Sequence, residues 1–315
     1  MSAPRDPRLL VVALGDRALR GTSRPTGAEA WLRELGRSLP PLADLATAGL
    51  RLVLTHGGGL PDGEPARGAR ARRPASPTAL DVRRAETQGG AGYLLEQALG
   101  NLCRGRNLEV PISAVVTRVR VDADDPAFRR PTRPVGPPVS VAMARRLQRE
   151  RGWAFAGGAA RGRRRVVPSP CPRQILEADA IRRLADAGVV VIAAGGGGVP
   201  VVETPLGHRG VEAVLQEDAT AALLATALAA DHLVFVTDVD RVEVGYGTRS
   251  IGIERLSVAE ARALLAAGEF PPGSMGPKIE AAIAFAEAAC REAIITSLPG
   301  LSAALDGRAG TRIGP

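Results

Sequence analysis

Glycine-rich turns are the feature of this sequence that most directly suggests chemistry. Three of them follow short apolar runs that are typical of strands, and a fourth follows a loop: Gly15-Asp16, Gly57–Gly59, Gly195–Gly198 and Gly273–Lys278. Glycine at a strand end lets a ligand approach the backbone, and the amides that open the next helix attract negative charge. Because parallel strands end at one sheet edge, these turns predict a crevice that binds an anionic ligand.

A few charged residues stand near the same predicted strand ends. Lys278 is the only lysine among the 315 residues, and arginine supplies the other positively charged side chains apart from histidine. One lysine in such a chain indicates a position that requires a compact ammonium group. Asp238 and Asp240 end another apolar run and could line a nucleotide or Mg²⁺ site, or simply cap a turn. Asp218 directly precedes a helical pattern and is expected to cap its N-terminus.

Other familiar catalytic patterns are missing from the sequence. It contains no P-loop, no dinucleotide-binding fingerprint and no nucleophile elbow. The three histidines have no metal-ligand spacing, and the three cysteines lie far apart. A serine hydrolase, a structural zinc site and a disulfide framework are therefore not expected, and no metal-ligating residues are predicted.

The elements that must position these residues are strands that alternate with helices. Apolar runs predict strands at Leu9–Leu14, Arg51–Thr55, Ser113–Arg120, Val189–Ala193, Val211–Leu215, Leu233–Thr237 and Ala293–Thr296. Helical patterns cover Ala28–Ser38, Leu80–Leu99, Val139–Glu150, Ile175–Ala187, Thr220–Ala230, Val258–Ala267 and Lys278–Ala288. This alternation predicts an α/β fold with a mainly parallel sheet. Gly57–Ala79 is expected to be a mobile loop, and Val121–Pro172 an excursion from the sheet.

Composition limits the class of protein. With 45% hydrophobic and 23% charged residues, the chain has the profile of a soluble globular protein. No apolar run approaches the ~18–20 residues that span a bilayer, so we expect no membrane association and a cytoplasmic location. The net charge of +8 comes from arginines spread over the whole chain, without interleaved aromatic residues. Nucleic acid is therefore not an expected partner.

At the level of whole motifs, the chain resembles the carbamate kinases of the amino-acid-kinase superfamily. The resemblance covers nearly the whole length and rests on many segments in one order. They include Val11–Gly15, Leu54–Gly57, Thr87–Gly89, Asp124–Phe128, Arg164–Pro170, Ala194–Pro200, Gly210–Val214, Thr237–Asp240, Pro272–Lys278 and Gly310–Ile313. It implies a three-layer αβα sandwich with an open sheet, a small protruding subdomain and a homodimer. It also implies reversible phosphoryl transfer between ATP and carbamate with Mg²⁺, and a place in arginine metabolism.

The same resemblance implies an arrangement of lobes and site residues. A single domain over residues 1–315 would have an acceptor lobe (about 1–205) with a protruding subdomain (about 118–165), and a nucleotide lobe (about 206–315). The implied catalytic residues are Lys278, Asp218 and Arg133. The implied substrate-binding residues are Gly15, Asp16, Arg17, Gly57, Gly58, Gly59, Gly195 and Gly196. The implied nucleotide-binding residues are Thr237, Asp238, Val239, Tyr246, Ser274, Met275, Gly276 and Lys278.

Several acceptor-side motifs depart from the family pattern. The family's Gly-Gly-Asn reads Gly15-Asp16-Arg17, its His-Gly-Asn reads His56-Gly57-Gly58, and its Thr-Lys-Pro reads Thr132-Arg133-Pro134. Its Asp-Lys-Asp reads Gln216-Glu217-Asp218, so that Glu217 replaces a cation with an anion beside a polyanionic substrate. Loss of one preorganised stabilising group typically costs ~10²–10³ in rate.

These departures leave three hypotheses open. The chain could be a carbamate kinase in which Arg17 or Arg133 supplies the missing charge. It could be a kinase of the same fold that acts on another small acid. It could also be a catalytically impaired, nucleotide-binding paralogue with a regulatory role.

Overall fold

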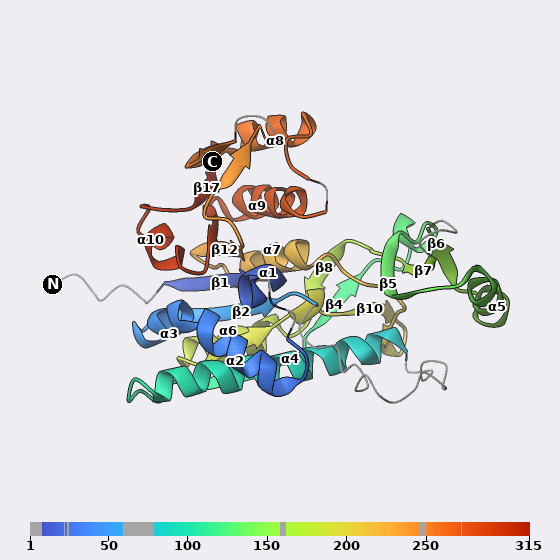
Figure 1. Cartoon of the computed structure of the whole chain (residues 1–315), viewed down its shortest axis with the longest axis horizontal. Helices are drawn as coiled ribbons and strands as arrows, with labels where there is room; N and C mark the ends of the chain where they lie inside the picture. Colours follow the sequence, from blue (N-terminus) through green and yellow to red (C-terminus); the bar gives the residue numbers. More distant parts are fainter. Residues whose placement is uncertain are drawn as a thin grey trace.

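The largest sheet follows the predicted alternation and runs through the centre of the molecule (Figure 1). The structure is a computed structural model that describes residues 8–21, 23, 25–58, 79–157, 162–245, 250–271 and 273–315. Within these ranges the sheet has eight strands, in the order β15 (Arg255–Ser257), β17 (Thr311–Gly314), β16 (Ala293–Ser297), β12 (His232–Thr237), β1 (Leu9–Leu14), β2 (Arg51–His56), β9 (Val190–Ala193) and β3 (Ile112–Val115). All neighbouring pairs are parallel except β16 and β17.

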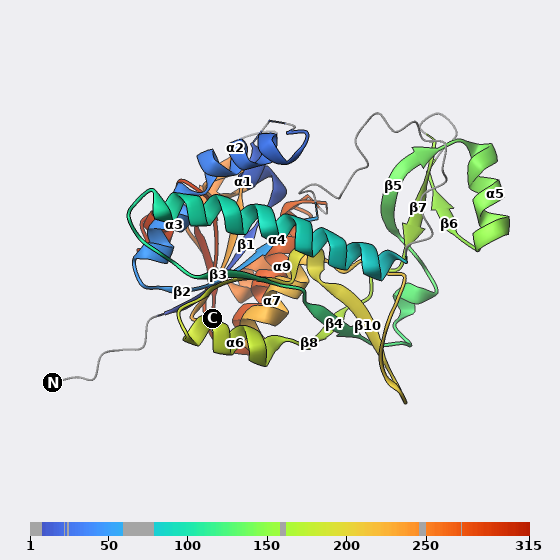
Figure 2. The same ribbon diagram turned by 90° about the horizontal axis from the view of Figure 1, so that it is seen from below.

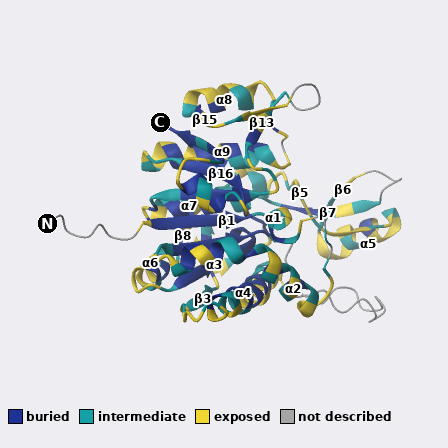
Figure 3. Ribbon diagram, turned by 60° about the vertical axis from the view of Figure 1, so that its left-hand side comes forward, coloured by how far each residue is buried: buried dark blue, intermediate teal, exposed yellow. Residues whose placement is uncertain are grey.

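Helices cover both faces of this sheet. Leu10, Val12 and Leu14 of β1 are buried against α1 (Asp16–Arg20), α2 (Ala28–Ser38), α3 (Pro40–Thr47), α4 (Leu80–Arg104) and α10 (Leu301–Leu305). The alternate residues Val11 and Ala13 are buried against α6 (Ala178–Asp186), α7 (Glu217–Ala227), α8 (Val258–Ala266) and α9 (Met275–Ala289). Figure 3 shows the buried strands between two partly exposed helical layers. The predicted αβα sandwich is therefore confirmed.

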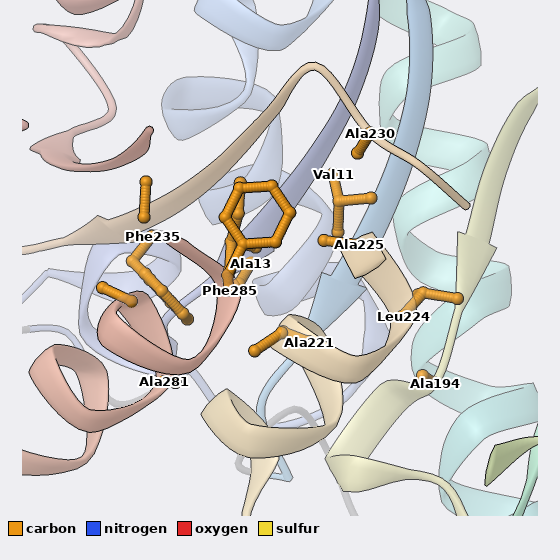
Figure 4. Close-up of a cluster of buried hydrophobic side chains, with 14 of the residues drawn as sticks. Val11, Ala13, Ala194, Ala221, Leu224, Ala225, Ala230, Phe235, Ala281 and Phe285 are labelled. Atoms are coloured by element: carbon orange, nitrogen blue, oxygen red, sulfur yellow. The ribbon is translucent and has the colours of Figure 1, made fainter. Parts of the chain in front are cut away.

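Small residues let two helices pack closely beside the strands that end at the crevice. Phe235 on β12 and Phe285 on α9 are fully buried, and most of the labelled side chains around them are alanines (Figure 4). Ala221 and Ala225 bring α7 against the same cluster. Because α7 and α9 share this core with β1 and β12, the positions of their first turns are fixed relative to the strand ends.

A small three-stranded sheet protrudes from the main body, at the right of Figures 1 and 2. Its order is β5 (Arg133–Val139), β7 (Arg163–Val167) and β6 (Ala154–Ala156), and α5 (Val141–Arg151) belongs to it. A separate four-stranded sheet contains β11 (Gly207–Gly210), β10 (Val199–Thr204), β4 (Arg118–Val121) and β8 (Pro172–Ile175). The first strand of the predicted subdomain range, β4, therefore pairs in this second sheet. Shorter elements are η1 (Pro126–Phe128), η3 (Gly195–Gly197), β13 (Val242–Val244) and β14 (Ile251–Ile253).

Three local predictions differ from the structure. Val211–Leu215 is not a strand: the Ala213 N–H donates to Val211 O and the Val214 N–H to Pro168 O, so the segment is an irregular buried connection. The run Ser113–Arg120 is divided between β3 and β4. Asp218 is not the N-cap of α7, because Gln216 occupies that position and Asp218 lies in the first turn.

Most of the predicted Gly57–Ala79 loop lies outside the described residues. In the part of the chain that is described, no helix combines the length and the apolar character that a membrane crossing requires.

Candidate active site

The turns that follow β1, β2 and β9 meet at one edge of the sheet. These strands are adjacent and parallel, so their carboxyl ends lie side by side. A Cβ atom built on Gly57 would lie 2.3 Å from Asp16 Oδ1, and one built on Gly196 would lie 3.8 Å from the Gly58 Cα. Gly196 and Gly197 also have positive φ angles of 61° and 86°, which glycine adopts without strain. The glycine turns after β1, β2 and β9 therefore lie together at the sheet edge where the sequence predicts the crevice.

A buried histidine separates two of these turns. His56 Nδ1 lies 2.8 Å from Gly57 O, and because a carbonyl can only accept, this nitrogen carries the proton. Burial lowers the pKa of His56, so the ring is neutral. Gly195 packs directly on the ring, since a Cβ there would lie 2.1 Å from Nε2. His56 thus sets the spacing between the turns after β2 and β9.

The only lysine forms an ion pair beside the crevice. Lys278 Nζ in the first turn of α9 lies 2.7 Å from Asp218 Oδ1 in the first turn of α7, and their side chains are 17% and 14% exposed. The ammonium also lies 5.8 Å from the centre of the Phe235 ring on β12. Asp218 fixes the direction of Lys278, whose ammonium has three N–H donors in all.

Glu217 is directed into the crevice, where it contacts the turn after β2. The Gly58 N–H donates to Glu217 Oε1 at 2.8 Å. Burial raises the pKa of the Glu217 carboxyl and the charge of Asp16 raises it further, whereas the Gly58 N–H and the charge of Arg133 act in the opposite direction. Glu217 therefore links α7 to the turn, and Arg133 of the protruding sheet contributes positive charge to the same region.

The predicted nucleotide-binding residues fall on two neighbouring elements. One is the end of β12, where Thr237 is the last strand residue and Asp238 and Val239 come next. The other is the start of α9, with Ser274 as the N-cap before Met275 and Gly276. Contact between Lys278 and the Phe235 ring joins the two elements. Asp238 Oδ2 also lies 3.4 Å from Arg17 Nη1, in a largely exposed pair. Of the remaining predicted site residues, Gly59 and Tyr246 lie outside the described residues.

One residue of the crevice was missed by the sequence interpretation. Arg84 Nη1, from the N-terminal part of α4, lies 3.2 Å from the positions that Cβ atoms on Gly58 and Gly196 would occupy. The sequence gives little indication that Arg84 belongs to the site, because arginine is abundant throughout the chain and Arg84 lies in none of the glycine turns. Only the long-range packing of α4 against the strand ends reveals its position.

Comparisons with known proteins agree with this architecture. The model of the amino acid kinase family matches residues 8–297. Carbamate kinase of Pyrococcus horikoshii is 38% identical over 98% of this chain and 100% of its own length. Carbamate kinase-like protein YahI of Escherichia coli is 40% identical over 97% of this chain and 98% of its own.

A solved structure extends the similarity to three dimensions. Carbamate kinase from Giardia lamblia bound to AMP-PNP superimposes with a TM-score of 0.90, at 34% identity and 98% coverage of both chains. Sequence and structure thus match over almost the entire length. This chain belongs to the amino acid kinase family, as a carbamate kinase-like phosphotransferase.

Proposed function

We propose that this protein catalyses reversible phosphoryl transfer between Mg-ATP and carbamate, so that carbamoyl phosphate and ADP give ATP in one direction. The observation that carries the proposal is the Lys278–Asp218 pair, which holds the only lysine beside the glycine turns. The full-length similarity to carbamate kinases supports the same reaction.

Phosphoryl transfer requires positioning and charge neutralisation more than covalent chemistry. In this proposal Lys278 neutralises charge on the transferred phosphoryl group, and Asp218 orients the Lys278 ammonium. The segments 237–239 and 274–278 would hold the nucleotide, and Mg²⁺ would arrive with it as part of the substrate. The turns after β1, β2 and β9 would hold the acceptor, because their backbones can approach a small ligand closely.

The test is ATP formation from carbamoyl phosphate and Mg-ADP, measured with hexokinase and glucose-6-phosphate dehydrogenase as coupling enzymes. We expect a rate well above that of the reaction without protein. A rate at that background, from a folded protein that binds Mg-ADP, would contradict the proposal and favour the regulatory paralogue.

A second candidate function has a specific observation in its favour. Two carboxylates, Asp16 and Glu217, border the acceptor turns. Both stand where the acceptor motifs depart from the family pattern, which favours an acceptor other than carbamate. Mg-ATP turnover with a panel of small carboxylates, compared with turnover with carbamate, tests this alternative. We expect carbamate to be the best substrate of the panel, and a faster carboxylate would replace it.

We further propose a homodimer in the cytoplasm, where ATP and ADP are present as substrates. β3 forms one edge of the main sheet, and Tyr93, Leu108 and Val116 near it are exposed. Unpaired strand edges and exposed apolar side chains are typical of surfaces that bind another chain. Sedimentation velocity should give about twice the 32.7 kDa of the chain, and a monomer at all concentrations would contradict the dimer.

A further inference from the structure

Arg84 occupies a defined place where two of the glycine turns meet. Its Nη1 atom lies 3.2 Å from the Cβ position of Gly58 and the same distance from that of Gly196. These glycines belong to the turns after β2 and β9. A side chain on either glycine would come into close contact with the guanidinium. Because both positions lack side chains, none stands between the guanidinium and the backbone of the two turns.

The helix that carries Arg84 is anchored on both sides of it. Before Arg84, the Leu80 N–H donates to Glu212 Oε1, and Glu212 also pairs with Arg165 of the protruding sheet. After Arg84, the buried Gln88 side chain accepts from the Thr117 N–H at 2.9 Å and donates to Thr117 O at 3.2 Å. Figure 2 shows α4 crossing the face of the sheet toward the protruding part. Arg84 thus extends from a fixed backbone.

Charge explains why a cation is needed at this junction. Glu217 Oε1 lies 3.2 Å from the Cβ position of Gly58, and Asp16 Oδ1 lies 2.3 Å from that of Gly57. Two carboxylates thus border a space that an anionic acceptor must enter, and each would repel it. Lys278 is directed by Asp218 on the nucleotide side. The Arg84 guanidinium lies within contact distance of both turns.

We propose that Arg84 is a substrate-binding residue that holds the carboxylate of carbamate, and the carbonyl oxygen of carbamoyl phosphate, beside Gly58 and Gly196. A planar guanidinium matches a carboxylate with two parallel N–H donors. Lys278 then serves the phosphoryl group, while Glu217 keeps the Gly58 turn in position. This assignment rests on the proposed carbamate kinase function and adds its acceptor-binding group.

The test compares Arg84→Met and Arg84→Lys with a matched control, Arg83→Met. Arg83 is the neighbouring residue of the same helix, and its side chain is exposed to solvent. For Arg84→Met we expect kcat/KM for carbamoyl phosphate to fall about 100-fold, the usual effect of losing one preorganised charged donor. The KM for Mg-ADP should stay within about twofold, since Arg84 is assigned to the acceptor alone. Arg84→Lys should fall between, and Arg83→Met should match the wild type.

A relocated charge gives a sharper test. Arg84 Nη1 and Glu217 Oε1 lie at equal distances from the Cβ position of Gly58, so a lysine at residue 217 would bring its ammonium to the same junction. The double variant Arg84→Met/Glu217→Lys should therefore recover at least tenfold of the kcat/KM that Arg84→Met loses. Recovery is expected to be partial, because Glu217 no longer accepts from the Gly58 N–H.

The outcomes separate this assignment from the proposed function. An active wild type with an unaffected Arg84→Met variant overturns only the role of Arg84, as does an equal rise in the KM values of both substrates. A wild type that forms no ATP contradicts the proposed function. In that case the role of Arg84 is still supported if calorimetry shows that the wild type binds carbamoyl phosphate and that Arg84→Met does not. Binding that is absent in the wild type, or unchanged in the variant, overturns the assignment. Mg-ADP binding shows that each variant is folded. If Arg84→Met does not bind Mg-ADP, Arg84→Gln is tested in its place.

Discussion

Replacement of Lys278 by methionine separates the chemistry of the crevice from its stability. Methionine has a similar length but no charge, so the variant removes the ammonium and leaves Asp218 without its 2.7 Å partner. Loss of a preorganised cation from the transferred phosphoryl group is expected to lower kcat by about 10²–10³. The KM for carbamoyl phosphate should change less, because the ammonium acts mainly on the transition state.

The stability cost follows from the geometry of the pair. Two unit charges 2.7 Å apart attract by about 6 kcal/mol at an effective dielectric constant of about 20. Desolvation of both groups offsets most of this attraction, and the side chains are still 17% and 14% exposed. We therefore expect the free energy of unfolding to fall by about 1–3 kcal/mol, below the 3–5 kcal/mol typical of a fully buried pair.

The assay combines urea unfolding with the coupled measurement of ATP formation. The double variant Lys278→Met/Asp218→Asn removes the orphaned carboxylate as well, so its stability should return to within about 1 kcal/mol of the wild type. Its kcat should stay as low as that of the single variant. A Lys278→Met variant that is folded and keeps more than a tenth of the wild-type kcat would refute the role assigned to this ammonium.

Two other changes test the local environment of the crevice. Burial and Asp16 raise the pKa of Glu217 above its ordinary 4.5, so the folded wild type loses stability as pH rises through that raised pKa. Glu217→Gln removes this loss. The free energy of unfolding of this variant should therefore exceed that of the wild type by an amount that grows from pH 4.5 upward. A difference that does not change with pH would contradict the burial of this charge. Gly195→Ala places a Cβ 2.1 Å from His56 Nε2 and should cost about 1–3 kcal/mol in urea unfolding. Gly90→Ala in α4 is the control, because a Cβ built on Gly90 would have no atom within 4 Å. This change should raise the free energy of unfolding by up to about 1 kcal/mol. Equal effects at both glycines would contradict the close packing of the turn.

The central part of the fold was predictable because its residues follow simple patterns. β1, β2, β9, β12 and β16 are buried on both faces and therefore appear as continuous apolar runs. The short strands β13 to β15 have three residues each, with exposed positions, and carry no such pattern. Val211–Leu215 shows the converse error, since its buried residues fill the core without pairing in a sheet.

The site was predictable to the extent that glycine marks it. The turns at Gly15, Gly57 and Gly195 follow their strands directly, and the parallel order of the strands brings them together. Contacts between distant segments were not predictable. Glu217 is a hydrogen-bond acceptor for Gly58, which the sequence alone shows only as an unfavourable charge. Arg84 is one arginine among many until α4 is packed against the turns.

Phosphorus NMR of carbamoyl phosphate mixed with Mg-ADP and the protein follows the transferred group itself. Our account predicts that the carbamoyl phosphate signal decreases while the γ-phosphate signal of ATP grows by an equal amount, and that Lys278→Met slows both changes together. A wild-type sample that releases only inorganic phosphate, or leaves both substrates intact while it binds Mg-ADP, would contradict the account.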